Sequence, residues 1–469
     1  MRLRALRILA AALAFAPAFA AATLPAPVRE ALARAGVPES AVGAVVEPVG
    51  GGRRTVDHQA AKPLNPASTI KLVTTFAGLE LLGPAYTFKT DVLVAGGIAH
   101  GVLDGDLVLR GGGDPKLTYE RLWQLAHQLR SRGLREIRGN VVLDRSRFAV
   151  ADHDPAKFDG ESRRAYNVGP DALLVNFKAI DFRFIPADGG VRVTGEPEFP
   201  NVEIASRLRV VKEPCNNWRR GIKPEIEENG LLATVVFTGT YPAECGEKSW
   251  PLSVFDADRY AEAALRWVWS EAGGKLTGQV KAGPAPAGAV LFHRFESEPL
   301  PTLVRDINKF SNNVMARQLF LALSMEKSGG RGEAGASARL IREWLAAKAI
   351  AADELVLENG AGLSRVERIS AGTMAALLRA AWASPVMPEL VSSLSLYAVD
   401  GTFKTRNGAP AGQAHLKGGT LTGVQSVAGV VHDAKGNRWA VTMIVNHENA
   451  NRAQPALDAL VDWVYRGRR

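Results

Sequence analysis

The chain has 469 residues, of which 46% are hydrophobic, and its formal net charge is +9. This length exceeds what one ordinary hydrophobic core supports, so two or three domains are expected. The basic balance suits an anionic polymer or a membrane surface, or it serves solubility alone. Because the sequence has no arginine-rich run and no nucleic-acid-binding motif, a nucleic-acid partner is not expected. The cysteines and histidines lack the spacing of metal ligands, and no metal or organic cofactor is expected.

Residues 1–20, MRLRALRILAAALAFAPAFA, combine a basic start, a short apolar run and a small-x-small end. This pattern is typical of a secretory signal cleaved after Ala20. A membrane anchor is the alternative, but the run is short and Pro17 interrupts it. The sequence therefore predicts export, with the periplasm as the expected compartment, and no later stretch is long and apolar enough to span a bilayer. Export also favours a disulfide between Cys215 and Cys245 over two unpaired thiols.

The predicted elements begin with a helix over residues 26–36, followed by two strands around a glycine-rich turn within 41–60. The next helix carries Ser68 and stops at Gly83-Pro84. From about Phe88 the pattern changes to alternating apolar and polar residues between glycine turns, which predicts strands and hairpins. The remaining elements of this half are a helix, a strand and a group of short strands, over 119–133, 139–146 and 166–254.

Helical periodicity returns at 257–272 and again over 299–325, where a break is expected near Ser311. The chain closes with a helix, two strands and a last helix, over 371–382, 420–447 and 454–466. The last helix is amphipathic but short, so we expect it to pack against the first helix rather than to lie on lipid. Helices and strands at both ends of a β-rich middle indicate one α/β domain interrupted by a long insertion.

A serine and a lysine three residues apart lie in LNPASTIKLVTT, at Ser68 and Lys71. Positions i and i+3 share one face of a helix, so the lysine amine can reach the hydroxyl. The amine acts as a base only if burial or nearby cations lower its pKa. The start of an ordinary amphipathic helix is the alternative. The same Ser-x-x-Lys pattern recurs at Ser324 and Lys327. There it lies in the predicted last turn of a helix, where the helix dipole opposes alkoxide formation.

Two further polar clusters strengthen the catalytic interpretation. Ser311-Asn312-Asn313 places a hydroxyl and an amide two residues apart, an arrangement that relays a proton and holds a substrate amide, or else caps a helix. Lys417-Gly418-Gly419-Thr420 supplies a positive charge and a backbone that other groups can approach closely, unless it is only a glycine-rich edge strand. The N–H of Thr420 can join that of Ser68 as an oxyanion hole. Lys327-Ser328-Gly329 is similar in sequence to the cluster at Lys417, but it lies in a predicted turn at the end of a helix.

These clusters, in this order, resemble the S-x-x-K, S-x-N and K-T-G motifs of the penicillin-recognising serine enzymes. The long insertion between the first two motifs is similar to the D-Ala-D-Ala carboxypeptidase/endopeptidase family, peptidase family S13, the class C low-molecular-mass penicillin-binding proteins. The stretches LVLRGGGDPKL, YNVGPDALLVNF, NGAGLSR and VDGTFKTR resemble the same family. The resemblance covers nearly the whole chain beyond the signal.

The resemblance implies an α/β (α+β) fold with a transpeptidase-like domain, whose antiparallel sheet is covered by helices. This catalytic domain is expected in residues 21–87 and 286–469. It is interrupted by an inserted domain II in residues 88–165 and 255–285, and by a β-rich domain III in residues 166–254.

The resemblance also implies the roles of the residues that carry the chemistry. Ser68 is the acylated nucleophile and Lys71 its general base. Ser311 and Asn313 shuttle the proton and position the substrate, and Lys417 shapes the electrostatics. The reaction is a two-step acyl transfer in which a D-Ala-D-X bond is broken and water releases the acyl group.

The sequence departs from the family pattern at two positions, Gly418 among the substrate-binding residues and Asn359 in a loop. Thr420 contributes to oxyanion and carboxylate binding beside Gly419, but Gly418 stands where the family has a threonine. The missing hydroxyl would cost roughly 1.5–3 kcal/mol if it bonded a charged carboxylate. Asn359 stands where the family usually has aspartate. Arg365 either contacts the donor peptide or forms a surface or inter-domain ion pair.

The expected partners are peptidoglycan peptide stems and, as acylating inhibitors, β-lactams. Peripheral attachment to a membrane, the oligomeric state and the balance of carboxypeptidase and endopeptidase activity are left open by the sequence. A β-lactamase is one alternative function, although the long insertion argues against it. A peptidoglycan-binding protein whose site is weakened at Gly418 is the other, although the retention of Ser68 and Lys71 argues against it.

Overall fold

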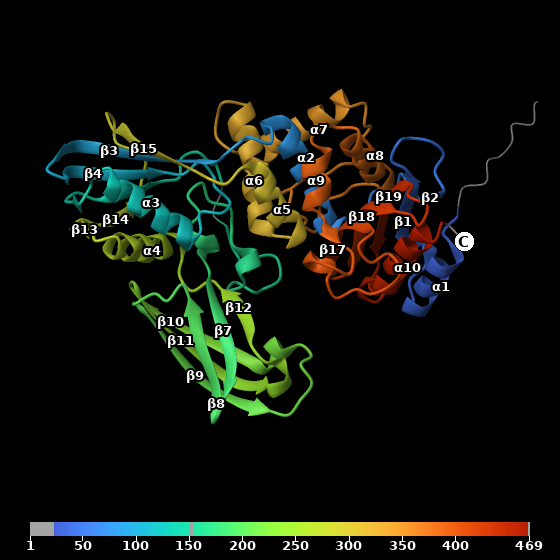
Figure 1. Ribbon diagram of the computed structural model, residues 1–469, viewed down its shortest axis with the longest axis horizontal. Coiled ribbons are helices and arrows are strands. Elements are labelled where there is room, and N and C mark those ends of the chain that lie inside the picture. Colours follow the sequence, from blue (N-terminus) through green and yellow to red (C-terminus); the bar gives the residue numbers. More distant parts are fainter. Residues whose placement is uncertain (1–22, 151–152, 468–469) are drawn as a thin grey trace, which may run out of the picture.

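The computed structural model describes residues 23–150 and 153–467 (Figure 1). The predicted secretory signal, residues 1–20, lies outside the described residues. Within the described part of the chain, no helix is both long enough and apolar enough to cross a membrane.

A six-stranded sheet combines strands from the early and the late parts of the described chain. Every neighbouring pair of strands in it is antiparallel. Its strands, in spatial order, are β16 (Ser395–Leu396), β17 (Ala414–Leu421), β18 (Val424–His432), β19 (Arg438–Asn446), β1 (Val42–Pro48) and β2 (Val56–His58). Side chains alternate between the faces of a strand. On β18, Val427 and Val431 therefore belong to one hydrophobic core, while Ala428 and Val430 belong to another.

Helices cover both faces of this sheet. The first core holds α1 (Ala26–Ala35) and α10 (Gln454–Tyr465), which pack against each other at one end of the molecule (Figure 1). The second core gathers α2 (Lys71–Leu82), α5 (Leu300–Lys309), α6 (Asn313–Lys327), α7 (Ala334–Ala347), α8 (Ala371–Trp382) and α9 (Met387–Ser393). The antiparallel sheet covered by helices confirms the predicted fold class, and the predicted pairing of the first and last helices is confirmed.

Local sequence explains where these helices begin and end. Gly36 closes α1 in the left-handed conformation, at φ 67°, which glycine adopts without steric cost. The expected break near Ser311 is confirmed, because α5 ends at Lys309 and α6 begins at Asn313. The side chain of Asn312 caps α6 by accepting a hydrogen bond from the N–H of Met315 at 3.0 Å.

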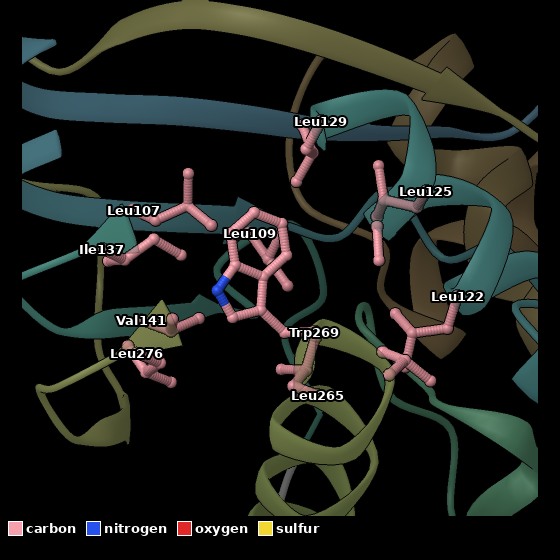
Figure 2. Close-up of a pocket in the computed structure, with 12 residues that line it drawn as sticks. Leu107, Leu109, Leu122, Leu125, Leu129, Ile137, Val141, Leu265, Trp269 and Leu276 are labelled. Carbon is pink, nitrogen blue, oxygen red and sulfur yellow. The ribbon is translucent and has the colours of Figure 1, made fainter. Parts of the chain in front are cut away.

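A seven-stranded sheet forms the second part of the molecule. Its strands are β3 (Lys89–Ala99), β4 (Val102–Arg110), β5 (Glu136–Ile137), β6 (Val141–Asp144), β13 (Lys275–Leu276), β14 (Val280–Ala282) and β15 (Val290–Glu296). The helices α3 (Tyr119–Ser131) and α4 (Ala257–Glu271) pack beside it (Figure 1). A cavity of about 30 Å³ remains between them, lined by apolar side chains around Trp269 (Figure 2). The indole N–H of Trp269 already donates to the carbonyl of Lys275 at 3.1 Å, and the other lining side chains are apolar, so the cavity is a packing void.

Two three-stranded sheets form the β-rich part, at the lower end of the view in Figure 1. One has the order β10 (Ile222–Asn229), β11 (Leu232–Pro242) and β9 (Val202–Val211); the other has β12 (Lys248–Leu252), β7 (Ile180–Ala187) and β8 (Gly190–Glu196). The predicted disulfide between Cys215 and Cys245 is present. The division of the chain into domains stays a prediction. The pairing of β15 with β3 favours a boundary after residue 296 rather than at 286.

Candidate active site

Ser68 and Lys71 lie together where a 3₁₀ turn, Ala67–Ile70, runs into α2. The Nζ of Lys71 is 3.0 Å from the Oγ of Ser68 and 2.6 Å from the Oδ1 of Asn313. A third contact joins Nζ to the carbonyl oxygen of Ala361. Lys71 has no exposed surface. A lysine buried at the start of a helix, with a serine hydroxyl as one of its three partners, differs from a residue on an ordinary amphipathic face.

The three partners of Lys71 fit both the charged and the neutral form of its amine. A neutral amine has two N–H groups and one lone pair. The carbonyl of Ala361 and the Oδ1 of Asn313 only accept hydrogen bonds, so they take the two N–H groups. The Ser68 Oγ is the third partner: it accepts from Nζ when the amine is charged, and its hydroxyl can donate to the lone pair when the amine is neutral. The contact is the one that proton exchange between Ser68 and Lys71 requires.

The backbone around Ser68 is held tightly by two neighbouring segments. Ala67 has a φ of 45°, and its N–H donates to the Oδ1 of Asn65 at 2.9 Å. A Cβ on Gly362 would lie 2.1 Å from the carbonyl oxygen of Ala67. A Cβ on Gly419 would lie 2.8 Å from the amide nitrogen of Ser68 and 2.4 Å from the Oγ of Ser426. Only glycine fits at positions 362 and 419, because the backbone approaches so closely there. The 3₁₀ turn Ala67–Ile70, called the nucleophile turn below, is therefore held from two sides.

Ser311 faces the second lysine of the site. It lies in the break between α5 and α6 with a φ of 57°, an uncommon value for a residue with a side chain. The Nζ of Lys417, on β17, is 2.8 Å from the Oγ of Ser311 and 2.8 Å from the carbonyl oxygen of Gly418. The strained backbone thus presents the Ser311 hydroxyl to Lys417, and the adjacent α6 presents Asn313 to Lys71.

Burial dominates the electrostatics of both lysines. Burial lowers the pKa of Lys71 well below its ordinary value, and the nearby charge of Lys417 lowers it further. The carboxylate of Glu367 acts in the opposite direction, and Arg317 adds to the lowering. Burial also lowers the pKa of Lys417 to about 7. The lowering of the Lys71 pKa is in the direction that a lysine base requires.

A cavity of about 240 Å³ opens beside Ser68. Ser311, Gly418, Gly419 and Thr420 also line it. The register of β17 against β18 places Thr420 opposite Gln425, and the Oγ1 of Thr420 donates to the Oε1 of Gln425 at 3.2 Å. Because a Cβ on Gly419 would lie 2.8 Å from the amide nitrogen of Ser68, the segments that carry Ser68 and Thr420 are neighbours, and both residues line the cavity.

The departure at Gly418 has a structural counterpart in this chain. A Cβ at position 418 would lie 3.3 Å from two ring atoms of Phe403, which lines the same cavity. The absent side chain therefore leaves room that the Phe403 ring partly fills. The other departure, Asn359, bonds within its own loop: its Oδ1 accepts from the N–H of Ala361 at 2.9 Å and its Nδ2 donates to the carbonyl of Leu363 at 3.0 Å.

Arg365 is the one predicted site residue that lines a different cavity. Its guanidinium lies over the ring of Phe158, 4.8 Å from the centroid, and its Nη1 donates to the carbonyl of Thr422 at 3.0 Å. Arg365 and Phe158 line a second cavity of about 530 Å³, together with Asn359 and Glu358. The other predicted residues from the three motifs surround Ser68.

The two look-alike sequences lie elsewhere and are bonded differently. Ser324 is fully buried in α6, and its hydroxyl is 2.9 Å from the Oγ of Ser337 and 3.2 Å from the carbonyl of Leu321. Lys327 is exposed. The hydroxyl of Ser324 thus has structural partners, and Lys327 is not among them. Among the described residues, no group of three or more His, Cys, Asp or Glu side chains is placed to hold a metal ion.

Sequence reasoning missed three residues that surround Lys71: Ala361, Glu367 and Arg317. Ala361 contributes only a carbonyl, for which the sequence carries no signal. Glu367 has no exposed surface, and Arg317 is 7% exposed. Arg317 follows Asn313 by one helical turn, so its presence on the same face of α6 was available from spacing.

Comparison with known proteins agrees with this geometry. Residues 24–466 match the sequence profile of the D-Ala-D-Ala carboxypeptidase 3 (S13) family. The chain belongs to that family. Thus the family predicted from the three motifs is confirmed.

Two relatives and one solved structure are similar to this chain over most of its length. The D-alanyl-D-alanine carboxypeptidase DacB of Haemophilus influenzae is 25% identical over 415 residues, which cover 87% of this chain and 85% of that protein. The carboxypeptidase Rv3627c of Mycobacterium tuberculosis is 30% identical over 427 residues, covering 85% and 74%. The crystal structure of penicillin binding protein 4 (dacB) from Haemophilus influenzae has a TM-score of 0.76 at 24% identity, covering 93% of this chain and 99% of that one. The last likeness shows that this chain and that protein share a fold.

Proposed function

We propose that this S13 enzyme is an exported, periplasmic serine D-Ala-D-Ala carboxypeptidase, DD-endopeptidase or both, acting on the peptide stems of peptidoglycan. The observation that carries the proposal is the set of contacts at Lys71 Nζ. A buried amine with two obligate acceptors and one hydroxyl, that of Ser68, is arranged to deprotonate that hydroxyl. Family membership supplies the D-Ala-D-X bond as the target.

Acylation follows from the positions of the atoms. Lys71 takes the proton of Ser68, and the Ser68 oxygen attacks the carbonyl carbon of the bond between D-Ala and the leaving residue. The N–H groups of Ser68 and Thr420 stabilise the oxyanion that forms. The C–N bond then breaks, the proton held by Lys71 passes to the leaving nitrogen, and the acyl group stays on Ser68.

Deacylation repeats the steps with water in place of the serine. Lys71, neutral again, removes a proton from a water molecule that attacks the ester carbonyl. The oxyanion is held by the same two N–H groups, and the Ser68 oxygen leaves with the proton. A free D-Ala as the first leaving group makes the enzyme a carboxypeptidase, and a cross-linked stem makes it an endopeptidase. Penicillin acylates the same serine, and its slow departure makes β-lactams inhibitors.

Ser311, Asn313 and Lys417 complete the proposal. Asn313 fixes Lys71 and faces the substrate amide, while the Ser311 hydroxyl relays the proton toward the leaving nitrogen. Lys417 attracts the substrate carboxylate, and its bond to Ser311 orients the relay. Thr420 binds the same carboxylate with its hydroxyl, beside the backbone of Gly418 and Gly419. Arg365, in the neighbouring cavity with Phe158, contacts the donor peptide.

The alternatives are less consistent with this site. A pure binding protein has no use for a buried lysine with a lowered pKa, because burial of Lys71 costs stability and gives no contact to a ligand. The gap at Gly418 removes one hydroxyl but leaves the Lys71 contacts intact. A β-lactamase shares the acylation chemistry and differs in fast deacylation. The apolar face of α10 packs against α1 in the hydrophobic core, so a peripheral contact with a membrane would use a surface other than this face.

Labelling with a fluorescent penicillin tests the nucleophile. Wild type and Ser324→Ala should be labelled at equal rates, and Ser68→Ala should not be labelled. Release of D-Ala from a pentapeptide and cleavage of cross-linked dimers would then separate the two peptidase activities, and nitrocefin turnover would reveal a β-lactamase. Labelling of Ser68→Ala, or D-Ala release by it at the wild-type rate, would refute the assignment.

A further inference from the structure

A fully buried carboxylate lies behind the catalytic lysine, and no step of the proposed mechanism uses it. Glu367 has no exposed surface and follows the turn formed by residues 358–362. Its Oε1 accepts hydrogen bonds from the N–H groups of Glu358, Asn359 and Gly360, at 3.1, 3.0 and 2.8 Å. Its Oε2 accepts from the N–H of Gly362 at 3.0 Å. One side chain therefore gathers four backbone donors of a single turn.

The same turn contacts the start of α2 through its carbonyl groups. The carbonyl of Ala361 accepts from Lys71 Nζ, and that of Gly360 accepts from Thr74 Oγ1 at 2.7 Å. The remaining N–H, that of Ala361, is bonded to Asn359 Oδ1. All five N–H groups of the turn thus point inward to side-chain oxygens, and two of its carbonyl groups point to α2. The turn transmits the position of Glu367 to the amine of Lys71.

We propose that Glu367 is a positioning residue for Lys71, holding the Ala361 carbonyl against the amine and placing one negative charge among the cations of the site. The proposal concerns the chemistry of the proposed function and rests on it. The charged groups that act on Lys71 are Lys417 and Arg317, which oppose its protonation, and Glu367, which favours it. Without Glu367 the amine loses both its fixed acceptor and its counter-charge.

The Glu367→Gln variant separates these effects. Glutamine keeps the shape and one accepting oxygen, but its Nε2 donates and cannot accept from a backbone N–H. Loss of the charge should lower the pKa of Lys71 further, because two cations remain unopposed. A base of lower pKa removes the Ser68 proton less readily once it is neutral. We expect the rising limb of the acylation rate against pH to move to lower pH by about one unit, and the plateau rate to fall about tenfold.

Glu354→Gln is the matched control. Glu354 is a half-buried carboxylate that accepts from the N–H of Ser370 at 3.0 Å and from Thr373 Oγ1 at 2.7 Å, at the start of α8. Its replacement removes comparable hydrogen bonds at the start of α8, and Glu354 is not among the charged groups that act on Lys71. We expect Glu354→Gln to lower the melting temperature but to leave the pH profile of penicillin acylation unchanged.

A second variant and a second readout keep the test decisive. Glu367→Asp retains the charge but is one methylene shorter, so the plateau should fall while the rising limb stays near its wild-type pH. The titration of Lys71, followed by ¹³Cε NMR of lysine-labelled enzyme, should give a lower midpoint in Glu367→Gln than in wild type even if penicillin does not acylate the enzyme. Failure of wild-type acylation would overturn the proposed function alone. An unshifted Lys71 midpoint in Glu367→Gln, or an equal shift in Glu354→Gln, would overturn the role of Glu367.

Discussion

The contact between β17 and the nucleophile turn gives a sharp test through two adjacent glycines. Replacement of Gly419 by alanine would bring a Cβ to 2.4 Å from Ser426 Oγ, 2.7 Å from the carbonyl oxygen of Pro66 and 2.8 Å from the amide nitrogen of Ser68. Two of these three atoms belong to the backbone and cannot rotate away. Overpacking of this kind costs about 1–3 kcal/mol. To relieve it, β17 must move away from the turn, which separates the two proposed oxyanion donors.

The expected loss of activity in Gly419→Ala is large because one oxyanion donor is worth about 10²–10³ in rate. Gly418→Ala is the control, since its Cβ meets only two ring atoms of Phe403 at 3.3 Å, and the ring can shift by a few tenths of an ångström. Stopped-flow acylation by nitrocefin or penicillin, with thermal melts of both variants, measures the two effects. Gly419→Ala acylated within threefold of wild type, or Gly418→Ala impaired as strongly as Gly419→Ala, would refute the packing argument.

Two further predictions concern Lys417 and the disulfide. Lys417, with a pKa lowered to about 7, is cationic below that pH and neutral above it. The KM for a peptide that ends in D-Ala-D-Ala with a free carboxylate should therefore rise as the pH increases through 7, while the KM for the same peptide with an amide terminus stays constant. Parallel KM profiles for the two peptides would contradict this role of Lys417. Cys215→Ser/Cys245→Ser opens a loop with a sequence separation of 30. It should destabilise the β-rich part by about 3.5 kcal/mol on chain-entropy grounds, visible as an earlier transition in calorimetry, with the penicillin acylation rate unchanged; unaltered calorimetry would contradict it.

Much of the fold was predictable because hydrophobic period and glycine placement agree locally. The helix ended by Gly36, the break between α5 and α6, and the pair of strands around residues 434–437 all occur as their patterns indicate. Pairing between distant strands was not predictable in this way. β15 resembles any short strand in sequence, yet it joins β3, which precedes it by almost two hundred positions, rather than the sheet of the nearer C-terminal strands. Non-local register is decided by packing of the whole sheet, for which a single strand carries little information.

The candidate site was predictable to the extent that function requires side chains at fixed spacing. Ser68, Lys71, Ser311, Asn313 and Lys417 were found by motif, and the structure brings them together. Their roles stay predictions until the variants are tested.

The supporting groups had no such signal. Ala361 acts through a backbone carbonyl, and Glu367 acts through four backbone N–H groups, so neither contribution depends on a motif. Even the requirement for glycine at position 419 is visible only once β17 lies against the nucleophile turn.

The two buried lysines indicate why proton transfer runs forward in the proposed mechanism. When Lys71 accepts the Ser68 proton, it becomes a buried cation beside Lys417 and Arg317, both of which oppose its charge. That state is unfavourable in a poorly solvated interior; the carboxylate of Glu367 opposes the cost by its charge, and the two acceptors of Lys71 oppose it by hydrogen bonding. The proton is therefore driven onward to the leaving nitrogen through Ser311, whose hydroxyl is already oriented by Lys417. In this mechanism the Glu367 carboxylate favours the charged form of Lys71 without a direct hydrogen bond to it, because the turn of residues 358–362 lies between them.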